Sequence, residues 1–195
     1  MDATILVNRT HRLPRKAIPQ TLVEPEIIFD APVGDRKRLL AVSAAKGVEA
    51  LFARGKEEGI YLCGVSGYRS YERQEELYQK KRREQPKENG DPVHWIAPPG
   101  ASEHQTGLAL DVSCQAVDYQ LDERFGDTRE GRWLKRCAPL YGFILRYPQD
   151  RQAATGGLAL VGRDAAKAGQ EQGHDVARQL PDGRYGHGGH VELPG

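Results

Sequence analysis

The chain has 195 residues, of which 38% are hydrophobic, so it is long enough for one hydrophobic core, and no change of composition divides it into two domains. Its 28 Lys and Arg residues nearly balance its 27 Asp and Glu residues, which argues against a nucleic-acid partner and against a disordered acidic chain. The longest apolar runs are a few residues long, far below the roughly 20 that cross a bilayer, so no membrane span is expected.

The N-terminal part is predicted to form an extended segment followed by a helix. Residues 4–26 contain three prolines with apolar residues between them, which favours a strap that lies across the domain. In residues 35–58 apolar side chains recur at steps of three and four, which predicts an amphipathic helix that ends at Gly59. The first residues lack the apolar core of a secretion signal. The localisation is therefore open: cytoplasmic, or the cell envelope if an export segment is missing.

A strand, a turn and a helix are predicted next. Residues 60–65 are rich in β-forming side chains, and the turn Ser-Gly-Tyr-Arg-Ser leads into a charged helix over 71–84. Residues 85–100 contain four prolines and must form a loop, and loops of this length are often functional.

The second half alternates short strands and helices, which favours an α+β fold over a parallel α/β fold. The predicted strands cover residues 108–112, 141–147 and 158–161, and the predicted helices cover 130–140 and 164–172. The pattern is lost beyond Gly173, so we predict one domain over 1–173 and a disordered tail over 174–195. Cys63, Cys114 and Cys137 form no CxxC pair and are expected to be ordinary buried thiols.

A histidine and an aspartate bracket a turn and a short apolar strand in the segment SEHQTGLALD, which begins at Ser102. Imidazole nitrogen and carboxylate oxygen are both zinc ligands, and a catalytic zinc uses three protein ligands and one water. A turn at Gly107 would let His104 and Asp111 face one point, whereas an unbroken strand would place them on opposite faces. The spacing alone favours a surface histidine and an aspartate that caps a strand, because spacing by itself rarely identifies a metal site.

The same string resembles the S-x-H-x-x-G-x-A-x-D motif of the VanY-like D-alanyl-D-alanine carboxypeptidases. Three further segments resemble this family in the same order along the chain: LVNRTHRLP, SGYRSYERQEELY and FGDTREGRWLKRCAPLYGFILRYP. Together they extend to about Pro148. The resemblance implies an α+β fold with a small, mostly antiparallel sheet and packed helices, the architecture of the hedgehog-like and D,D-peptidase-like zinc enzymes.

The resemblance also implies roles for individual residues. His104 and Asp111 match two of the family's three zinc ligands. Arg69 matches the catalytic arginine that binds substrate and stabilises charge on the tetrahedral intermediate, for which a fixed, permanently charged guanidinium is suited. The alternative for Arg69 is an ion pair with Glu72 or Glu76 at the start of the helix.

The implied substrate is a peptidoglycan stem peptide or precursor that ends in D-alanine, and the implied cofactor is Zn²⁺. Ser66, Gln74 and Ser102 are expected to bind this substrate together with Arg69. L,D-carboxypeptidases and endopeptidases share the scaffold, so the sequence does not decide which bond is cleaved. The protein is expected to act as a monomer.

One element of the family is missing from the sequence. The family carries an E-x-x-H element, with the general base and the third zinc ligand, but residues 155–162 read TGGLALVG and contain neither residue. Loss of a general base lowers the reaction rate by about 10²–10⁴-fold, so impaired catalysis is predicted. Histidines of the tail are the candidates to replace the ligand: His174, His187 and His190.

Two alternatives to an impaired enzyme follow from this gap. The chain could be a catalytically inactive module that still binds D-Ala termini or peptidoglycan. It could also be a truncated product without function, which would be marked by poor solubility and non-cooperative melting.

Overall fold

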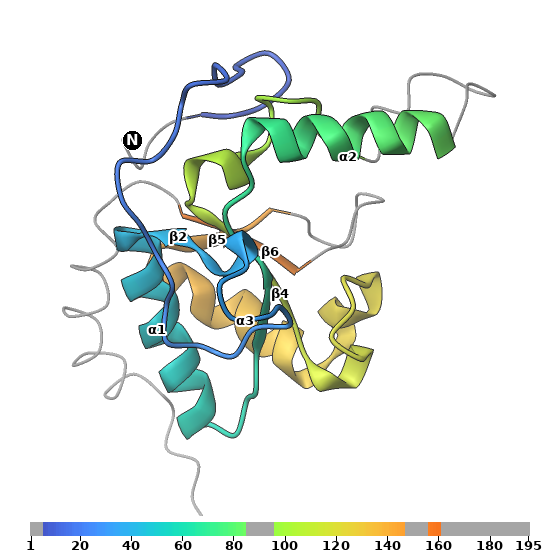
Figure 1. Ribbon diagram of the computed structural model, residues 1–195. Helices are drawn as coiled ribbons and strands as arrows, with labels where there is room; N and C mark the ends of the chain where they lie inside the picture. Colours follow the sequence, from blue (N-terminus) through green and yellow to red (C-terminus); the bar gives the residue numbers. More distant parts are fainter. Residues whose placement is uncertain (1–5, 85–95, 147–155, 161–195) are drawn as a thin grey trace, which may run out of the picture.

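The computed structural model describes residues 6–84 and 96–146, and the backbone of residues 156–160. A four-stranded antiparallel sheet with strand order β3-β4-β6-β5 lies at its centre (Figure 1). The four strands are β3 (Cys63–Ser66), β4 (Ala109–Ser113), β5 (Phe143–Leu145) and β6 (Gly156–Leu160). Helices and an antiparallel sheet confirm the predicted α+β class.

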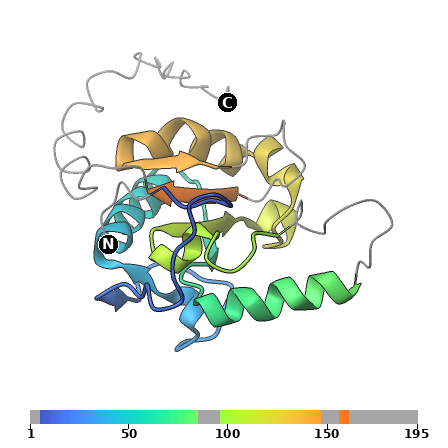
Figure 2. The same ribbon diagram turned by 90° about the horizontal axis from the view of Figure 1, so that it is seen from above.

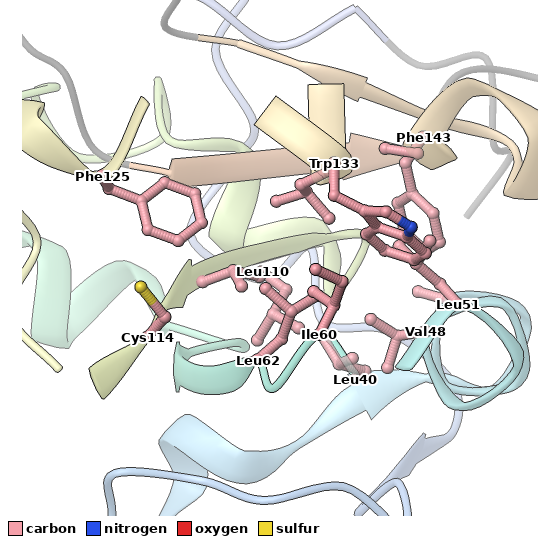
Figure 3. Close-up of a cluster of buried hydrophobic side chains, with 14 of the residues drawn as sticks. Leu40, Val48, Leu51, Ile60, Leu62, Leu110, Cys114, Phe125, Trp133 and Phe143 are labelled. Carbon is pink, nitrogen blue, oxygen red and sulfur yellow. The ribbon is translucent and has the colours of Figure 1, made fainter. Parts of the chain in front are cut away.

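Helices α1 (Val42–Glu57) and α3 (Arg129–Cys137) enclose the hydrophobic core with the sheet. Figure 3 shows Leu51 of α1, Trp133 of α3 and Leu110 of β4 in one cluster of buried side chains. All three are at most 2% exposed, so this packing holds the sheet in place. Helix α2 (Tyr71–Glu84) lies apart from α1 and α3, across the other side of the sheet (Figure 2), and Gln74 is its buried residue.

Two predicted elements lie at or within one residue of their expected limits. Helix α2 covers the predicted residues 71–84, and β4 is shifted by one residue from the predicted strand 108–112. The predicted helix over 130–140 is divided into α3 and a 3₁₀ turn (Ala138–Tyr141), because Pro139 cannot donate the hydrogen bond that would continue α3. The predicted helix 164–172, the tail over 174–195 and most of the loop 85–100 lie outside the described residues.

The start of the predicted helix 35–58 was wrong. Residues 36–38 form a 3₁₀ turn, and β2 (Leu40–Ala41) pairs with β1 (Leu22–Val23) before α1 begins. The backbone carbonyls of Lys37 and Leu39 accept hydrogen bonds from the amides of Gly67 and Tyr68, at 2.6 and 2.7 Å. These carbonyls therefore bind the turn after β3 instead of an α-helical turn, which no local periodicity could reveal.

The predicted N-terminal strap is present. Val7 and Leu13 are buried, and the Leu13 amide donates to the carbonyl of Gly100 at 2.8 Å. The guanidinium of Arg15 lies 5.0 Å from the ring centre of Tyr71, at the start of α2. The strap thus ties α2 to the loop that precedes β4. None of the helices in the described part of the chain is both long and apolar enough to span a membrane.

Candidate functional site

A bulge in the pairing of β3 with β4 forms the first part of the site. The register shifts between Gly64 and Ser66, so Ser66, and not Val65, lies opposite Asp111. Bulges of this kind redirect a side chain and are common beside active sites. Here the shift places Ser66 opposite Asp111, and both residues are buried, with exposures of 5% and 6%.

The turn before β4 brings His104 toward Asp111. Residues Glu103–Thr106 form a 3₁₀ helix that ends at Gly107, whose φ of 71° lies in the left-handed region. The backbone amide of Gly107 donates to the carbonyl of His104 at 3.2 Å. The predicted turn at Gly107 is confirmed, and it reverses the chain between the two predicted metal ligands.

The side chains of His104 and Asp111 meet at the end of this turn. Nε2 of His104 lies 3.4 Å from Oδ2 of Asp111, and both side chains are at least 86% buried. Nδ1 of His104 lies 2.7 Å from the carbonyl oxygen of Gly67. A carbonyl oxygen only accepts, so Nδ1 carries a proton, and Nε2 is the ring nitrogen that faces Asp111. This second hydrogen bond is typical of metal-ligating histidines.

Arg69 lies near the same oxygen atom of Asp111 as His104 does. Its guanidinium donates to Oε1 of Gln74 at 3.0 Å and to Oγ of Ser66 at 3.1 Å, and it lies 3.9 Å from Oδ2 of Asp111. The backbone amide of Arg69 donates to the carbonyl of His104 at 3.1 Å. Together with the contact of His104 with Gly67, this hydrogen bond ties the turn after β3 to the turn before β4.

Both polar atoms of the Gln74 side chain are hydrogen-bonded in this cluster. Its Oε1 accepts from Arg69, and its Nε2 donates to the carbonyl of Ala97 at 2.6 Å. With 1% of its surface exposed, it fixes Arg69 relative to the loop before β4. A direct contact of Gln74 with substrate stays a prediction.

The charge of Asp111 is maintained by its neighbours. Burial by itself raises the pKa of this carboxyl, but the hydrogen bond and charge of His104 and the charge of Arg69 more than offset burial, and the pKa is lowered. Asp111 is therefore a carboxylate at neutral pH, as a metal ligand must be.

The structure brings five of the six predicted site residues into this cluster: Ser66, Arg69, Gln74, His104 and Asp111. The sixth, Ser102, is 7% exposed and stands directly before the turn that carries His104. Their roles in catalysis, substrate binding and metal binding remain predictions. The two carboxylates proposed as alternative partners of Arg69 contact other arginines: Glu72 lies 3.9 Å from Arg15, and Glu76 lies 2.8 Å from Arg73.

Three supporting contacts escaped the sequence analysis. The Gly67 carbonyl orients His104, and Gln105 donates to the carbonyls of Pro14 and Ala17 at 3.0 and 3.2 Å. The carboxylate of Glu103, next to His104, accepts two hydrogen bonds from the guanidinium of Arg146. Each contact joins residues at least 37 positions apart, so no local pattern could have indicated it.

His104 and Asp111 fit two positions of a zinc centre, but the described residues do not complete it. Within residues 6–84 and 96–146, no three His, Cys, Asp or Glu side chains are grouped so that they could hold a metal ion. Strand β6 adds no candidate, because its sequence, GGLAL, contains none of these residue types. A third protein ligand would have to come from a segment outside the described residues.

Comparison with known proteins identifies the scaffold. A family model described as "VanY: D-alanyl-D-alanine carboxypeptidase" matches residues 37–158. The putative carboxypeptidase YodJ of Bacillus subtilis is 37% identical over 172 residues, which cover 85% of this chain and 62% of YodJ. The chain thus spans less than two thirds of the length of this relative.

Two solved structures share the fold. The LD-carboxypeptidase LdcB, whose structure concerns peptidoglycan recognition, has a TM-score of 0.76 and 36% identity over 86% of this chain and 80% of LdcB. A variant of the vancomycin-resistance D,D-pentapeptidase VanY in complex with Zn(II) has a TM-score of 0.60 and 26% identity over 85% of this chain and 92% of that chain. Motifs, fold and family match agree, and the chain belongs to the VanY family of D-alanyl-D-alanine carboxypeptidases.

Proposed function

We propose that this protein acts on peptidoglycan stem peptides or precursors that end in D-alanine, as a zinc-dependent D-alanyl-D-alanine carboxypeptidase with impaired catalysis. The observation that carries the proposal is the convergence of Arg69 and His104 on the buried carboxylate of Asp111. The family match and the Zn(II) complex of a VanY variant support the same reaction and the same metal.

In the proposed site, Arg69 binds the negative charge of the substrate. A guanidinium is permanently charged and offers several donors in a fixed plane, which suits a terminal carboxylate or the oxyanion of a tetrahedral intermediate. Gln74 and Ser66 hold this group at hydrogen-bonding distance, so little side-chain freedom remains to be lost when substrate binds.

His104 and Asp111 would hold the metal. Because Nδ1 of His104 is bound to the Gly67 carbonyl, Nε2 is the nitrogen that would bind the metal, and Asp111 stays ionised because its pKa is lowered. A bound zinc would supply an activated water and polarise the scissile carbonyl. The impairment is proposed because β6 supplies neither a carboxylate base nor a third ligand.

The test is release of free D-alanine from a stem pentapeptide ending in D-Ala-D-Ala, measured by mass spectrometry with added zinc. A tetrapeptide with an L,D bond at its C-terminus tests the alternative specificity, and Arg69→Gln is the control for the site. Slow release by the parent, abolished in the variant, supports the proposal. Binding of the pentapeptide without release would favour the inactive D-Ala-binding module, since β6 lacks the base. If the parent neither bound the pentapeptide nor released D-alanine from it, both functions would be contradicted.

A further inference from the structure

Strand β6 lies beside the predicted metal ligand Asp111. It runs antiparallel between β4 and β5, and Figure 2 shows it close to β5 within the sheet. In the β4–β6 pairing, Gly157 is the partner of Asp111, and the next pair joins Leu158 to Leu110. Position 157 is therefore the position of β6 directly opposite the carboxylate.

The two faces of β4 show toward which side position 157 lies. Leu110 and Val112 are at most 1% exposed and belong to the hydrophobic core, whereas Asp111 belongs to the other face and contacts His104 and Arg69. Residues directly opposite each other in an antiparallel pair share a face, with Cβ atoms about 4.5–5.5 Å apart. A side chain introduced at position 157 would therefore leave the sheet beside Asp111.

Glycine places no side chain at this position. Asp111 has Ser66 opposite it on β3 and Gly157 opposite it on β6. A catalytic zinc centre needs three protein ligands, and the described residues supply His104 and Asp111. The position directly opposite Asp111 on β6, where a third ligand could stand, is therefore occupied by a residue without a side chain.

We infer that Gly157 is the point at which the metal centre of this chain is incomplete, and that one ligating side chain at position 157 completes it with His104 and Asp111. The inference rests on the metal pair of the proposed function. It concerns metal binding alone, so it can be tested without any hydrolysis by the protein.

The test compares the full-length parent with Gly157→His and Gly157→Cys. Gly156→His is the matched control, because Gly156 pairs with Val112 and so belongs to the core-facing side of the strand. The readouts are zinc per chain after dialysis, zinc affinity by competition with a chromogenic chelator, and the visible spectrum of added Co²⁺. Circular dichroism checks that each variant is folded. The second variant, with a smaller side chain, keeps the test valid if the histidine prevents folding.

A folded position-157 variant should hold close to one zinc per chain, with an affinity at least about 100-fold above that of the parent, since even loss of an outer-shell partner changes metal affinity about 10–100-fold. It should also give a tetrahedral Co²⁺ spectrum, and His104→Ala in the same background should remove both signals. Two results would overturn the inference: one zinc per chain in the parent, or folded position-157 variants that bind zinc no better than Gly156→His. Failure of the proposed function would appear separately, as absence of D-Ala-peptide binding and release by the parent.

Discussion

The carbonyl oxygen of Gly67 accepts a hydrogen bond from Nδ1 of His104 at 2.7 Å, and this contact sets the direction of the imidazole. Gly67 lies in the turn between Ser66 and Arg69, so one backbone position orients the histidine and carries two further site residues. The same turn is packed closely: a Cβ atom on Gly67 would lie 2.5 Å from the carbonyl oxygen of Leu39 and 2.9 Å from that of Lys37.

We therefore expect Gly67→Ala to displace this turn. Both contacting atoms belong to the backbone and cannot rotate away, so the change should lower the free energy of unfolding by about 1–3 kcal/mol. Chemical denaturation measures this loss. A loss of stability close to zero would show that the turn after β3 has more room than the structure indicates.

The turn at Gly107 allows a controlled comparison. Gly107 and Gly34 both have positive φ, 71° and 85°, but a Cβ atom on Gly107 would lie 3.0 Å from the backbone nitrogen of Ala41, whereas one on Gly34 would meet nothing within 4 Å. Alanine in this backbone region costs about 1–2 kcal/mol at either position. Gly107→Ala should be the more destabilising of the two in thermal or chemical unfolding. Equal losses of stability in Gly107→Ala and Gly34→Ala would mean that Gly107 is required only for its φ angle.

The N-terminal strap should depend on Gln105 more than on Arg15. Gln105 is 2% exposed and donates to the carbonyls of Pro14 and Ala17, so Gln105→Ala should cost about 1–3 kcal/mol. The ion pair of Arg15 with Glu75 is largely solvent-exposed, and Arg15→Ala should cost at most about 1 kcal/mol. Limited proteolysis measures release of the strap, and faster cleavage in Arg15→Ala than in Gln105→Ala would reverse this ranking.

The three thiols differ in access to solvent. Cys63 and Cys114 are buried, Cys137 is half-buried, and burial raises the pKa of all three. At neutral pH in the folded protein, a thiol reagent should therefore react slowly, and first at Cys137. Mass spectrometry of the labelled peptides identifies the order of reaction, and rapid labelling of Cys63 would show that β3 opens readily.

Much of the site could be predicted because its residues lie in two short segments. SGYRS carries Ser66 and Arg69, and SEHQTGLALD carries Ser102, His104 and Asp111, so the resemblance of these segments to the family's motifs was sufficient to select them. The turn at Gly107 also followed from local reasoning, because only a reversal of the chain lets residues seven apart face one point. Helix α2 also followed from its local sequence, and its limits were correct.

What the sequence did not reveal depends on contacts between distant segments. The strand β2 replaced the first turns of a predicted helix because the carbonyls of Lys37 and Leu39 bind the turn after β3. The bulge that pairs Ser66 with Asp111, and the register that pairs Gly157 with Asp111, are properties of the assembled sheet. The sequence showed that a ligand was missing, and the register shows where a replacement would have to stand.

Calorimetric titration of the parent with a stem pentapeptide ending in D-Ala-D-Ala, compared with the same peptide as its C-terminal amide, tests most directly whether the Arg69 site recognises a D-alanine terminus. A hydrogen bond to a charged group contributes about 1.5–3 kcal/mol, so the free carboxylate should bind about 10–100-fold more tightly than the amide. Arg69→Gln should remove this preference while leaving the circular dichroism spectrum unchanged. Equal affinity of the parent for both peptides, or no heat from either, would contradict the proposed role of the site.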